Sequence, residues 1–369
     1  MTWTQFDEYG VSTPTDSSNI HFSRSLDGGL TWSTPVRLNK TAGDCVDSDS
    51  TTEGAVPAVG PNGEVYVGWA GPVGIRFNKS LDHGNSWLPH DILVNPQPTG
   101  WDYMISGIER CNGLPITACD ISHGPHRGNI YINWSDQRNG DYDTDIWLAK
   151  STDGGNTWTA AKRVNDDSYA KQQFFTWMTV DQVTGYLWFI FYDRRNYADD
   201  NTDVYLAVSK DGGETFVNFK ISNSPFIPND AVFFGDYTNI SAYNNVVRPI
   251  WTRLKNGNLS VWTAIVDTTM LGIDNYDLTD EFSLDQNNPN PFIDNTYVSF
   301  ELHKPTTVSL KVYDIFGRVI ATLIDNDKYN AGKFVRHFDA TQYNLQSGTY
   351  YLSLISNEQI LTRKMLLLK

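Results

Sequence analysis

Four copies of one short pattern, S-x-D-x-G-x-[ST]-[WF], constrain the fold of this chain more than any other feature of its sequence. The copies occupy residues 25–32 (SLDGGLTW), 80–87 (SLDHGNSW), 151–158 (STDGGNTW) and 209–216 (SKDGGETF). Their aspartates are Asp27, Asp82, Asp153 and Asp211, so successive copies lie 55, 71 and 58 residues apart. Self-similarity at such a period is typical of arrays of one supersecondary unit.

Each copy has the composition of a hairpin turn. The Asp carboxylate can accept hydrogen bonds from turn amides, and the glycine tolerates a positive φ. The residue that closes each copy is aromatic and offers a large apolar face to pack beneath the turn. These closing residues are Trp32, Trp87, Trp158 and Phe216. We therefore predict that the four copies are structural rather than catalytic.

The residues before each turn alternate apolar and polar side chains, as in DIWLAKS and DVYLAVS. Alternation of this kind predicts a half-buried strand, and further strand-like segments lie upstream of it in each unit. Four such strands make an antiparallel sheet, and sheets repeated around an axis make a β-propeller. Units start near residues 52, 113, 172 and 232, after a partial unit at 1–45 that begins as if within a second strand. We expect an all-β propeller that is truncated at its N-terminus and lacks a signal peptide here.

The four turns resemble Asp-boxes, also called BNR repeats, which are the signature of sialidases and of many propellers that are not sialidases. The resemblance covers residues 1–268 and implies a sialidase-type propeller of about six blades. The resemblance is specific for the fold and much less specific for an enzymatic activity.

The last part of the chain differs in composition from the first. Residues 281–369 hold nine acidic and nine basic residues, so the net charge of −15 lies in residues 1–280. All 12 tryptophans also lie in that first part. We expect a propeller at 1–270, a linker at 271–281 and a small immunoglobulin-like β-sandwich at 282–369, where short strands alternate with Gly and Asn turns.

The segment 282–369 resembles the type A sorting domain of the type IX secretion system. The resemblance rests on QNNPNPF, VSLKVYDIFGR, SGTYYLSL and the terminal KMLLLK, which occur in the order typical of that family. It implies that the type IX secretion machinery is a partner through residues 282–369 and that the protein is secreted or held at the cell surface. A carbohydrate-binding or adhesive sandwich is the alternative interpretation.

The resemblance to sialidases implies a site near the propeller axis, with three arginines that grip a substrate carboxylate, a Tyr nucleophile, a Glu and an Asp acid. The candidates are Tyr237, Asp236 and Glu53 for catalysis and Arg110, Arg138, Arg195 and Arg253 for the carboxylate. Trp101 and Trp177 are candidates for stacking on a sugar. The F/Y-R-I-P motif that normally carries the first arginine is absent from this sequence, and no spacing singles these residues out. The implied function is retaining hydrolysis of terminal sialic acids by an exported enzyme that acts on a glycan or glycoprotein. The alternative is a propeller without catalysis that binds glycan or protein.

A second pattern occurs twice, as WSDQRNGDYDTDIWLA at 134–149 and FYDRRNYADDNTDVYLA at 191–207. One interpretation is a repeated Asp–Arg pair that holds a long loop between two strands. The second is a structural calcium site at Asp141, Asp143 and Asp145 or at Asp199, Asp200 and Asp203, since alternating carboxylates suit a hard cation, and the third is a pair of loops that contact a ligand. We expect no cofactor to be required.

Charge and cysteine content exclude other classes. A net charge of −15 argues against binding to nucleic acid or to anionic membranes. No apolar run approaches the length of a membrane span. Cys45, Cys111 and Cys119 follow no metal-binding spacing, and a disulfide with one unpaired cysteine is an open alternative in an exported protein.

Overall fold

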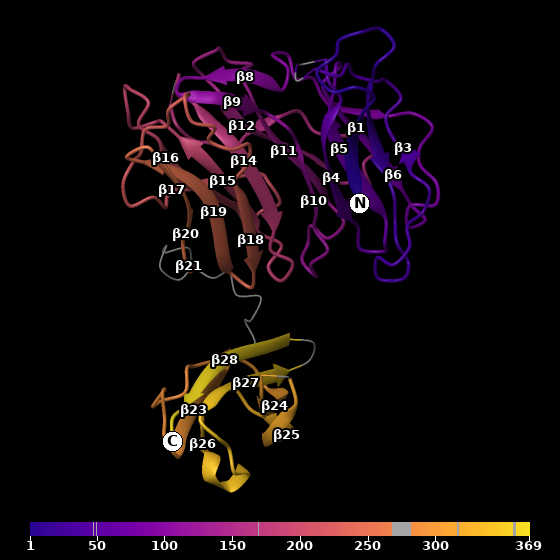
Figure 1. Ribbon diagram of the computed structural model, residues 1–369. Coiled ribbons are helices and arrows are strands. Elements are labelled where there is room, and N and C mark those ends of the chain that lie inside the picture. The colour runs from indigo at the N-terminus through magenta and orange to yellow at the C-terminus, as the bar shows by residue number, and fades with distance from the viewer. Residues whose placement is uncertain (47, 49, 169, 268–281, 316, 357–358) are drawn as a thin grey trace. The chain divides into compact units, whose positions relative to one another are not determined.

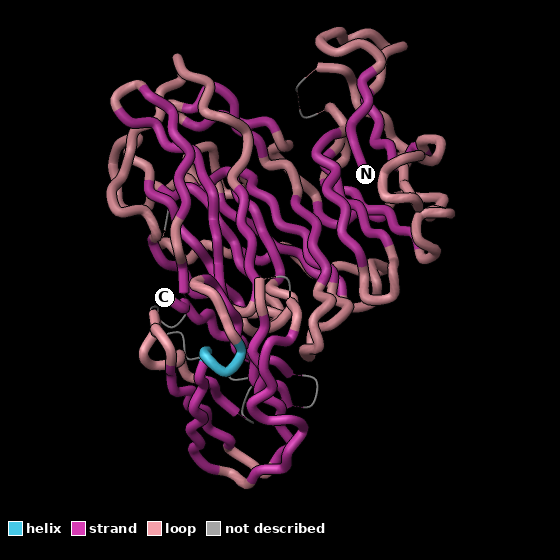
Figure 2. Tube along the Cα trace, turned by 60° about the horizontal axis from the view of Figure 1, so that its bottom comes forward, coloured by secondary structure: helices cyan, strands magenta, loops and turns pink. Residues whose placement is uncertain are grey.

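Antiparallel strands make up nearly all of the regular structure, as the alternating patterns predict (Figures 1 and 2). The computed structural model describes residues 1–46, 48, 50–168, 170–267, 282–315, 317–356 and 359–369. The chain divides into two units, Met1–Ile273 and Asp274–Lys369. The predicted linker at 271–281 lies outside the described residues. The all-β fold is confirmed.

The described residues of the first unit form five successive blade-like sheets, in which strand order follows the chain. Sheet 1 is β1 (Thr2–Phe6), β2 (Ser18–Phe22) and β3 (Val36–Arg37), and sheet 2 is β4 (Glu53–Val59), β5 (Val65–Ala70), β6 (Ile75–Ser80) and β7 (Ile92–Asn95). Sheet 3 is β10 (Ile116–Cys119), β11 (Ile130–Asp136), β12 (Asp145–Ser151) and β13 (Lys162–Arg163), and sheet 4 is β14 (Gln173–Val180), β15 (Leu187–Asp193), β16 (Asp203–Ser209) and β17 (Val217–Lys220). Sheet 5 is β18 (Asn239–Tyr243), β19 (Val246–Lys255) and β20 (Asn258–Thr263), with β21 (Val266–Asp267) paired to β19. A separate hairpin, β8 (Asp102–Ile105) and β9 (Ile108–Asn112), lies between sheets 2 and 3 along the chain.

The sheets are the blades of a propeller. Their first strands β4, β10, β14 and β18 contact one another in chain order, and β1 contacts β4. Apolar clusters fill the junctions between neighbouring blades. Trp69 packs with Phe22 of sheet 1, for example, and Trp251 of sheet 5 packs with Trp188 of sheet 4. The wide apolar faces of these sheets therefore bury each other from blade to blade.

The four repeated turns have one geometry. In the copy at 151–158, Asp153 Oδ1 accepts from Ser151 Oγ at 2.8 Å and from the Thr157 amide at 2.9 Å, while Thr157 Oγ1 donates to Oδ2 at 2.6 Å. The same three bonds recur in the other copies, around Asp27, Asp82 and Asp211. These hydrogen bonds favour the ionised carboxylate and lower the pKa of Asp27 and of Asp211 to about 2.

The turns also join the blades to one another. Trp87 lies 4.8 Å from Phe22 and Trp158 lies 5.1 Å from Phe77, both in the preceding sheet, whereas Trp32 of the first copy is 50% exposed. The basic residue just before each of the first three turns donates to a carbonyl of the next turn. These bonds are Arg24 to His83 O at 2.6 Å, Lys79 to Gly154 O at 2.6 Å and Lys150 to Gly212 O at 2.9 Å. Val208 occupies the equivalent position in sheet 4.

The second unit is a sandwich of two antiparallel sheets around one apolar core. One sheet is β22 (Phe282–Leu284), β23 (Asn295–Leu302) and β26 (Gly332–Asp339), and the other is β25 (Val319–Tyr329), β24 (Thr306–Tyr313), β27 (Gly348–Ser356) and β28 (Gln359–Leu367). A short 3-10 helix, Ala340–Tyr343, follows β26 (Figure 2). Among the described residues, no helix is long and apolar enough to cross a membrane.

All three cysteines are buried free thiols, so no disulfide joins Cys45, Cys111 and Cys119. Burial raises the pKa of the Cys119 thiol to about 12 and that of Cys111 still further. Thiols held protonated in this way are inert, and we assign them to packing.

Candidate functional site

The two edges of the propeller blades differ in their connections. The Asp-box turns join third to fourth strands at one edge. Because strands in a blade alternate in direction, the loops between second and third strands lie at the opposite edge, together with the segments that lead into each next first strand. This edge, which we call the loop edge, carries the β8–β9 hairpin and the segment 225–238.

An ion pair joins the β8–β9 hairpin to the segment 225–238. Arg110 Nε and Nη2 donate to Asp236 Oδ1 and Oδ2 at 2.9 Å and 2.7 Å, which is the bidentate geometry of a strong charge-assisted pair. Asn112 Nδ2 donates to the Asp236 carbonyl at 3.1 Å and fixes the same two segments a second time. The side chain of Arg110 is 43% exposed and that of Asp236 is 18% exposed. The structure therefore pairs two residues that the sequence assigned separately to carboxylate binding and to acid catalysis.

One aromatic ring contacts this ion pair, and a second pair of rings includes Tyr237, the residue after Asp236. The Arg110 guanidinium lies 5.7 Å from the ring centre of Phe233, and Trp177 meets Tyr237 edge to face at 6.1 Å. Phe233 is 52% exposed and Tyr237 is 55% exposed, which is unusual for rings of this size. We call Arg110, Trp177, Phe233, Asp236 and Tyr237 the hairpin site.

Strand β14 is distorted where it approaches the hairpin site. Phe175 has a φ of +50°, and the pairing register of β14 shifts between Phe174 and Trp177. A positive φ is a strained conformation for a bulky residue. It is held by burial of the Phe175 ring and by Thr238 Oγ1, which donates to the Phe175 carbonyl at 2.6 Å. The distortion changes which face of β14 each side chain lies on, just before Trp177.

A cavity of about 410 Å³ opens at the tip of the same hairpin. Its lining comes from the hairpin turn, from residues 227–230, from the loop after β19 and from Asp200. Asp200 and Asp230 are its charged residues, and none of its lining residues is Lys or Arg. Asp200 accepts from Ser106 Oγ at 2.8 Å and from Arg194 at 3.1 Å. A volume of this size is within the roughly 300–1,000 Å³ of small-molecule sites, and its charge disfavours an anionic ligand.

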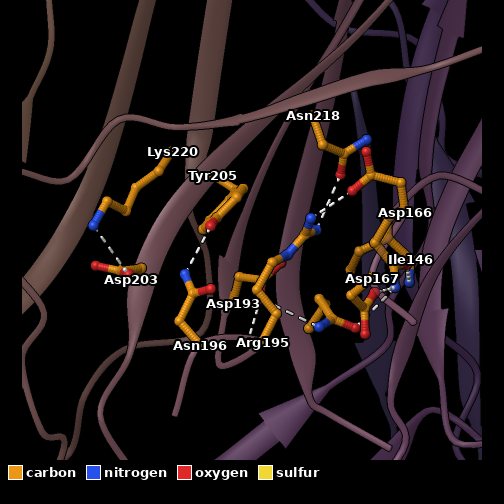
Figure 3. A network of polar contacts seen from close by, with 12 residues as sticks. Ile146, Asp166, Asp167, Asp193, Arg195, Asn196, Asp203, Tyr205, Asn218 and Lys220 are labelled. Atoms are coloured by element: carbon orange, nitrogen blue, oxygen red, sulfur yellow. Dashed lines mark hydrogen bonds and ion pairs between the residues drawn. The ribbon is translucent and has the colours of Figure 1, made fainter. Parts of the chain in front are cut away.

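The other three predicted arginines do not join Arg110. Arg138 pairs with Asp136, donates to Asn95 and lies 4.5 Å from the ring of Trp147. Arg195 pairs with Asp193, binds Asp166 and lies 4.4 Å from the ring of Tyr205 (Figure 3). Arg253 donates to Ser224 Oγ and to the Pro225 carbonyl. Each guanidinium therefore has its own set of partners in a different part of the unit, and the described residues show no convergence of three arginines on one pocket.

Trp101 has different surroundings from those expected, and Glu53 lies in a different blade from Tyr237. Trp101 is 4% exposed and its indole N–H donates to the Thr51 carbonyl at 3.2 Å, so its ring is packed rather than open to a sugar. Glu53 begins β4 in sheet 2, whereas Tyr237 lies just before β18 in sheet 5. Trp177 is the stacking candidate that the structure brings to the hairpin site.

The two D-x-R-N loops have the repeated Asp–Arg pair that the first interpretation of this pattern describes. Asp136 faces Asp145 across β11 and β12, and Asp193 faces Asp203 across β15 and β16. Each arginine binds the aspartate two residues before it and an acceptor on another segment, and so locks its loop. Burial raises the pKa of Asp193 to about 6, although Arg195 opposes this.

The predicted calcium trio does not converge. Asp145 is fully buried and accepts from Asn139, Arg163 and Asn165, whereas Asp141 is exposed. No group of three His, Cys, Asp or Glu able to hold a metal ion occurs in the part of the chain that the structure describes. Carboxylates at alternate positions along a turn and the start of a strand point in different directions. This explains why the three aspartates do not form the calcium site that the sequence suggested.

Asn165 is a structural residue that the sequence reasoning missed. Its Oδ1 accepts from the Ile146 amide, and its Nδ2 donates to Asp145, Asp167 and Gln173. Asn39 holds the Ile20 amide in sheet 1 and Ser222 holds the Val204 amide in sheet 4 in the same way. The sequence holds a repeated pair, an apolar residue and then Asn or Ser, after the last strands of sheets 1, 3 and 4, in VRLN, KRVN and FKIS.

Comparison with known proteins identifies the second unit. Residues 288–368 match the family described as the secretion system C-terminal sorting domain. The C-terminal unit is thus a type IX sorting domain, and the protein is exported to the cell surface or the extracellular space. No curated protein matches the sequence.

Solved structures with similarity to the chain have low sequence identity. The Hadza microbial sialidase Hz136 is 12% identical over 95% of this chain and 73% of that chain, with a TM-score of 0.41. The polysaccharide lyase Uly1 is 11% identical over 95% of this chain and 85% of that chain, with a TM-score of 0.40. A variant of the NanB sialidase from Streptococcus pneumoniae is 14% identical over 69% of this chain and 35% of that chain, with a TM-score of 0.38.

Proposed function

We propose that the exported protein binds glycans at the hairpin site and in the adjoining cavity, and that the sugar it takes is neutral or carries an amine. The observation that carries this proposal is an acidic cavity at the tip of the β8–β9 hairpin together with two exposed rings on the segment 225–238, which also contributes to that cavity. Phe233 and Tyr237 offer flat apolar faces, against which a sugar ring can pack. Asp200 and Asp230 offer acceptors for hydroxyl or ammonium groups.

The Arg110–Asp236 pair supports the same preference. An arginine that already holds a carboxylate of its own chain in bidentate geometry has less attraction for the carboxylate of a substrate. A sialic acid would have to displace Asp236 and would then lie beside an uncompensated aspartate. We therefore expect Arg110 to position the segment that carries Phe233 and Tyr237.

Hydrolysis of α-sialosides is the second candidate function. It is supported by the proximity of Arg110, Asp236 and Tyr237, three of the residues that the sialidase resemblance singled out. It would use Tyr237 as the nucleophile and a carboxylate as the acid. The two candidates differ in the charge of the ligand, which makes them separable.

Calorimetric titration of the full chain with methyl glycosides of hexoses, hexosamines and N-acetylhexosamines tests the proposal, beside a fluorogenic α-sialoside assay. We expect a neutral or amino glycoside to bind and the sialoside to remain intact. Phe233→Ala and Tyr237→Ala should each weaken binding about tenfold or more, since truncating a central aromatic contact costs about 2 kcal/mol. Tyr243→Ala is the matched control, because Tyr243 is 70% exposed at the far end of β18.

Two results would overturn the proposal. Absence of binding by every glycoside would exclude a glycan site of this kind. Turnover of the sialoside that is lost in Arg110→Ala would establish the second candidate in its place.

A further inference from the structure

A second cavity, of about 380 Å³, lies between sheets 4 and 5. One wall is formed by the end of β17 and the residues that follow it, to Asn223. The other wall is formed by β19, β20 and the segment that leads to Val266. It shares no lining residue with the cavity at the hairpin tip.

Arg253 lines this second cavity and has an unused donor. Its side chain belongs to the face of β19 that packs on sheet 4, and the residue is only 6% exposed. Nη2 donates to Ser224 Oγ at 2.7 Å and to the Pro225 carbonyl at 3.1 Å. Nε is buried and has no hydrogen-bond partner among the described residues. A buried charged donor without an acceptor is costly, and native structures leave few of them.

The charge of the cavity is opposite to that of the protein. Lys220 and Arg253 are its charged lining residues, and none of its lining residues is Asp or Glu. The chain as a whole carries a net charge of −15, so two cations without a carboxylate in one lining are a local exception. Lys220 lies 3.5 Å from Asp203, a buried carboxylate outside the lining that offsets part of its charge (Figure 3). Unlike Arg110, it is held by a single long contact and remains 41% exposed, so its ammonium group is accessible to a ligand.

An aromatic ring completes the site. The Trp262 ring lies 4.9 Å from the Arg253 guanidinium and is 38% exposed. Its indole N–H donates to Ser260 Oγ at 2.8 Å, which fixes the plane of the ring. Ile265 and Val266 extend the apolar surface beside it.

From these features we propose that the second cavity binds a carboxylate-bearing sugar at the end of a glycan chain, a uronate residue. Its carboxylate accepts from the Arg253 guanidinium and from Lys220, and its ring packs on Trp262. The two cavities therefore take sugars of different charge, and the inference goes beyond the function proposed for the hairpin site because it does not depend on that site.

The test compares two ligands that differ only in the carboxylate, methyl β-D-glucuronide and methyl β-D-glucoside, in calorimetric titrations of the full chain. We expect the glucuronide to bind at least tenfold more tightly. Lys220→Gln should reduce that preference several-fold, and Arg253→Gln should remove most of it. Arg248→Gln is the matched control, because Arg248 lies on the same strand in the exposed face, whereas Arg253 belongs to the buried one.

Arg253 is buried, so the far-ultraviolet circular dichroism and tryptophan emission of Arg253→Gln are compared with those of the unaltered chain. If that variant does not fold, Lys220→Gln decides the question, since Lys220 is partly exposed and its loss leaves the core intact. Equal affinity for the two glycosides in a chain that also carries Tyr237→Ala, which weakens binding at the hairpin site, would overturn the proposal. So would an effect of Lys220→Gln no larger than that of Arg248→Gln.

Discussion

Replacing Asp211 by Asn tests whether the Asp-boxes stabilise the propeller through an ionised carboxylate. The carboxylate accepts from Ser209 Oγ at 2.8 Å, from the Glu214 and Thr215 amides at 2.9 Å each and from Thr215 Oγ1 at 2.5 Å. An asparagine at this position keeps one acceptor oxygen but loses the charge and cannot accept from Thr215 Oγ1. We expect Asp211→Asn to unfold more easily at neutral pH.

The pKa gives the size and the sign of this effect. The hydrogen bonds lower the pKa of Asp211 from 3.8 to about 2, a difference of about 1.8, which corresponds to about 2.4 kcal/mol for a fully buried group. The side chain is partly exposed, so solvent screening reduces the expected loss to about 1 kcal/mol. A lowered pKa means that the stabilisation is present above pH 3.8 and is lost as the pH falls through about 2.

Urea unfolding followed by tryptophan emission measures this effect in the propeller alone, because all 12 tryptophans lie in that unit. The difference between the unaltered chain and Asp211→Asn should be largest at pH 6 to 7 and should shrink toward pH 2. Asp141→Asn removes an exposed carboxylate at the loop edge and serves as the control. A difference for Asp211→Asn that stays constant from pH 7 to pH 2.5 would refute the electrostatic reasoning.

Two further predictions concern contacts between and within blades. Lys150→Met removes the bond to Gly212 O that links sheet 3 to the turn of sheet 4, and we expect it to lower the free energy of urea unfolding by about 1 kcal/mol. Lys162→Met is the control, because Lys162 is the more exposed partner of Glu214, and it should lower the free energy of unfolding by less than about 0.5 kcal/mol. Asp193 has a raised pKa of about 6, so its protonation stabilises the folded state as the pH falls from about 6 toward 4. The unaltered chain should therefore gain about 1–3 kcal/mol in this range relative to Asp193→Asn, and parallel pH profiles of the two proteins would contradict the assignment.

The blade architecture could be predicted because its determinants are local. Every hydrogen bond that defines the turn around Asp153 joins residues no more than four positions apart. The pattern of DIWLAKS correctly predicted a strand, but the expectation of a half-buried one was wrong, because neighbouring blades cover both faces and leave only Lys150 partly exposed. Short patterns of this kind predict the same local structure wherever they occur in a sequence.

The functional site could not be predicted in the same way. Arg110 and Asp236 lie 126 positions apart, and the sequence around one residue does not indicate that it pairs with the other. Trp177 meets Tyr237 just after a register shift in β14 at Phe175. Phe175 has a positive φ, which no residue pattern predicts. The sequence offered Arg138, Arg195 and Arg253 beside Arg110 as carboxylate binders, with no spacing that separated them. In the structure, Arg138 and Arg195 are each held by the aspartate two positions before them.

The difference between the two cavities follows from where each lies on the fold. The cavity at the hairpin tip is built from loop-edge segments, which are rich in Asp and Asn because those residues favour turns, so it is acidic as a consequence of its loops. The second cavity is built from strand ends at the junction of sheets 4 and 5, where Arg253 is buried on the same face of β19 as Val247 and Trp251. An arginine at such a position destabilises the junction unless an anion offsets its burial. A fold that needed only packing there would be more stable with an apolar residue, and this is the physical reason to connect Arg253 with a ligand.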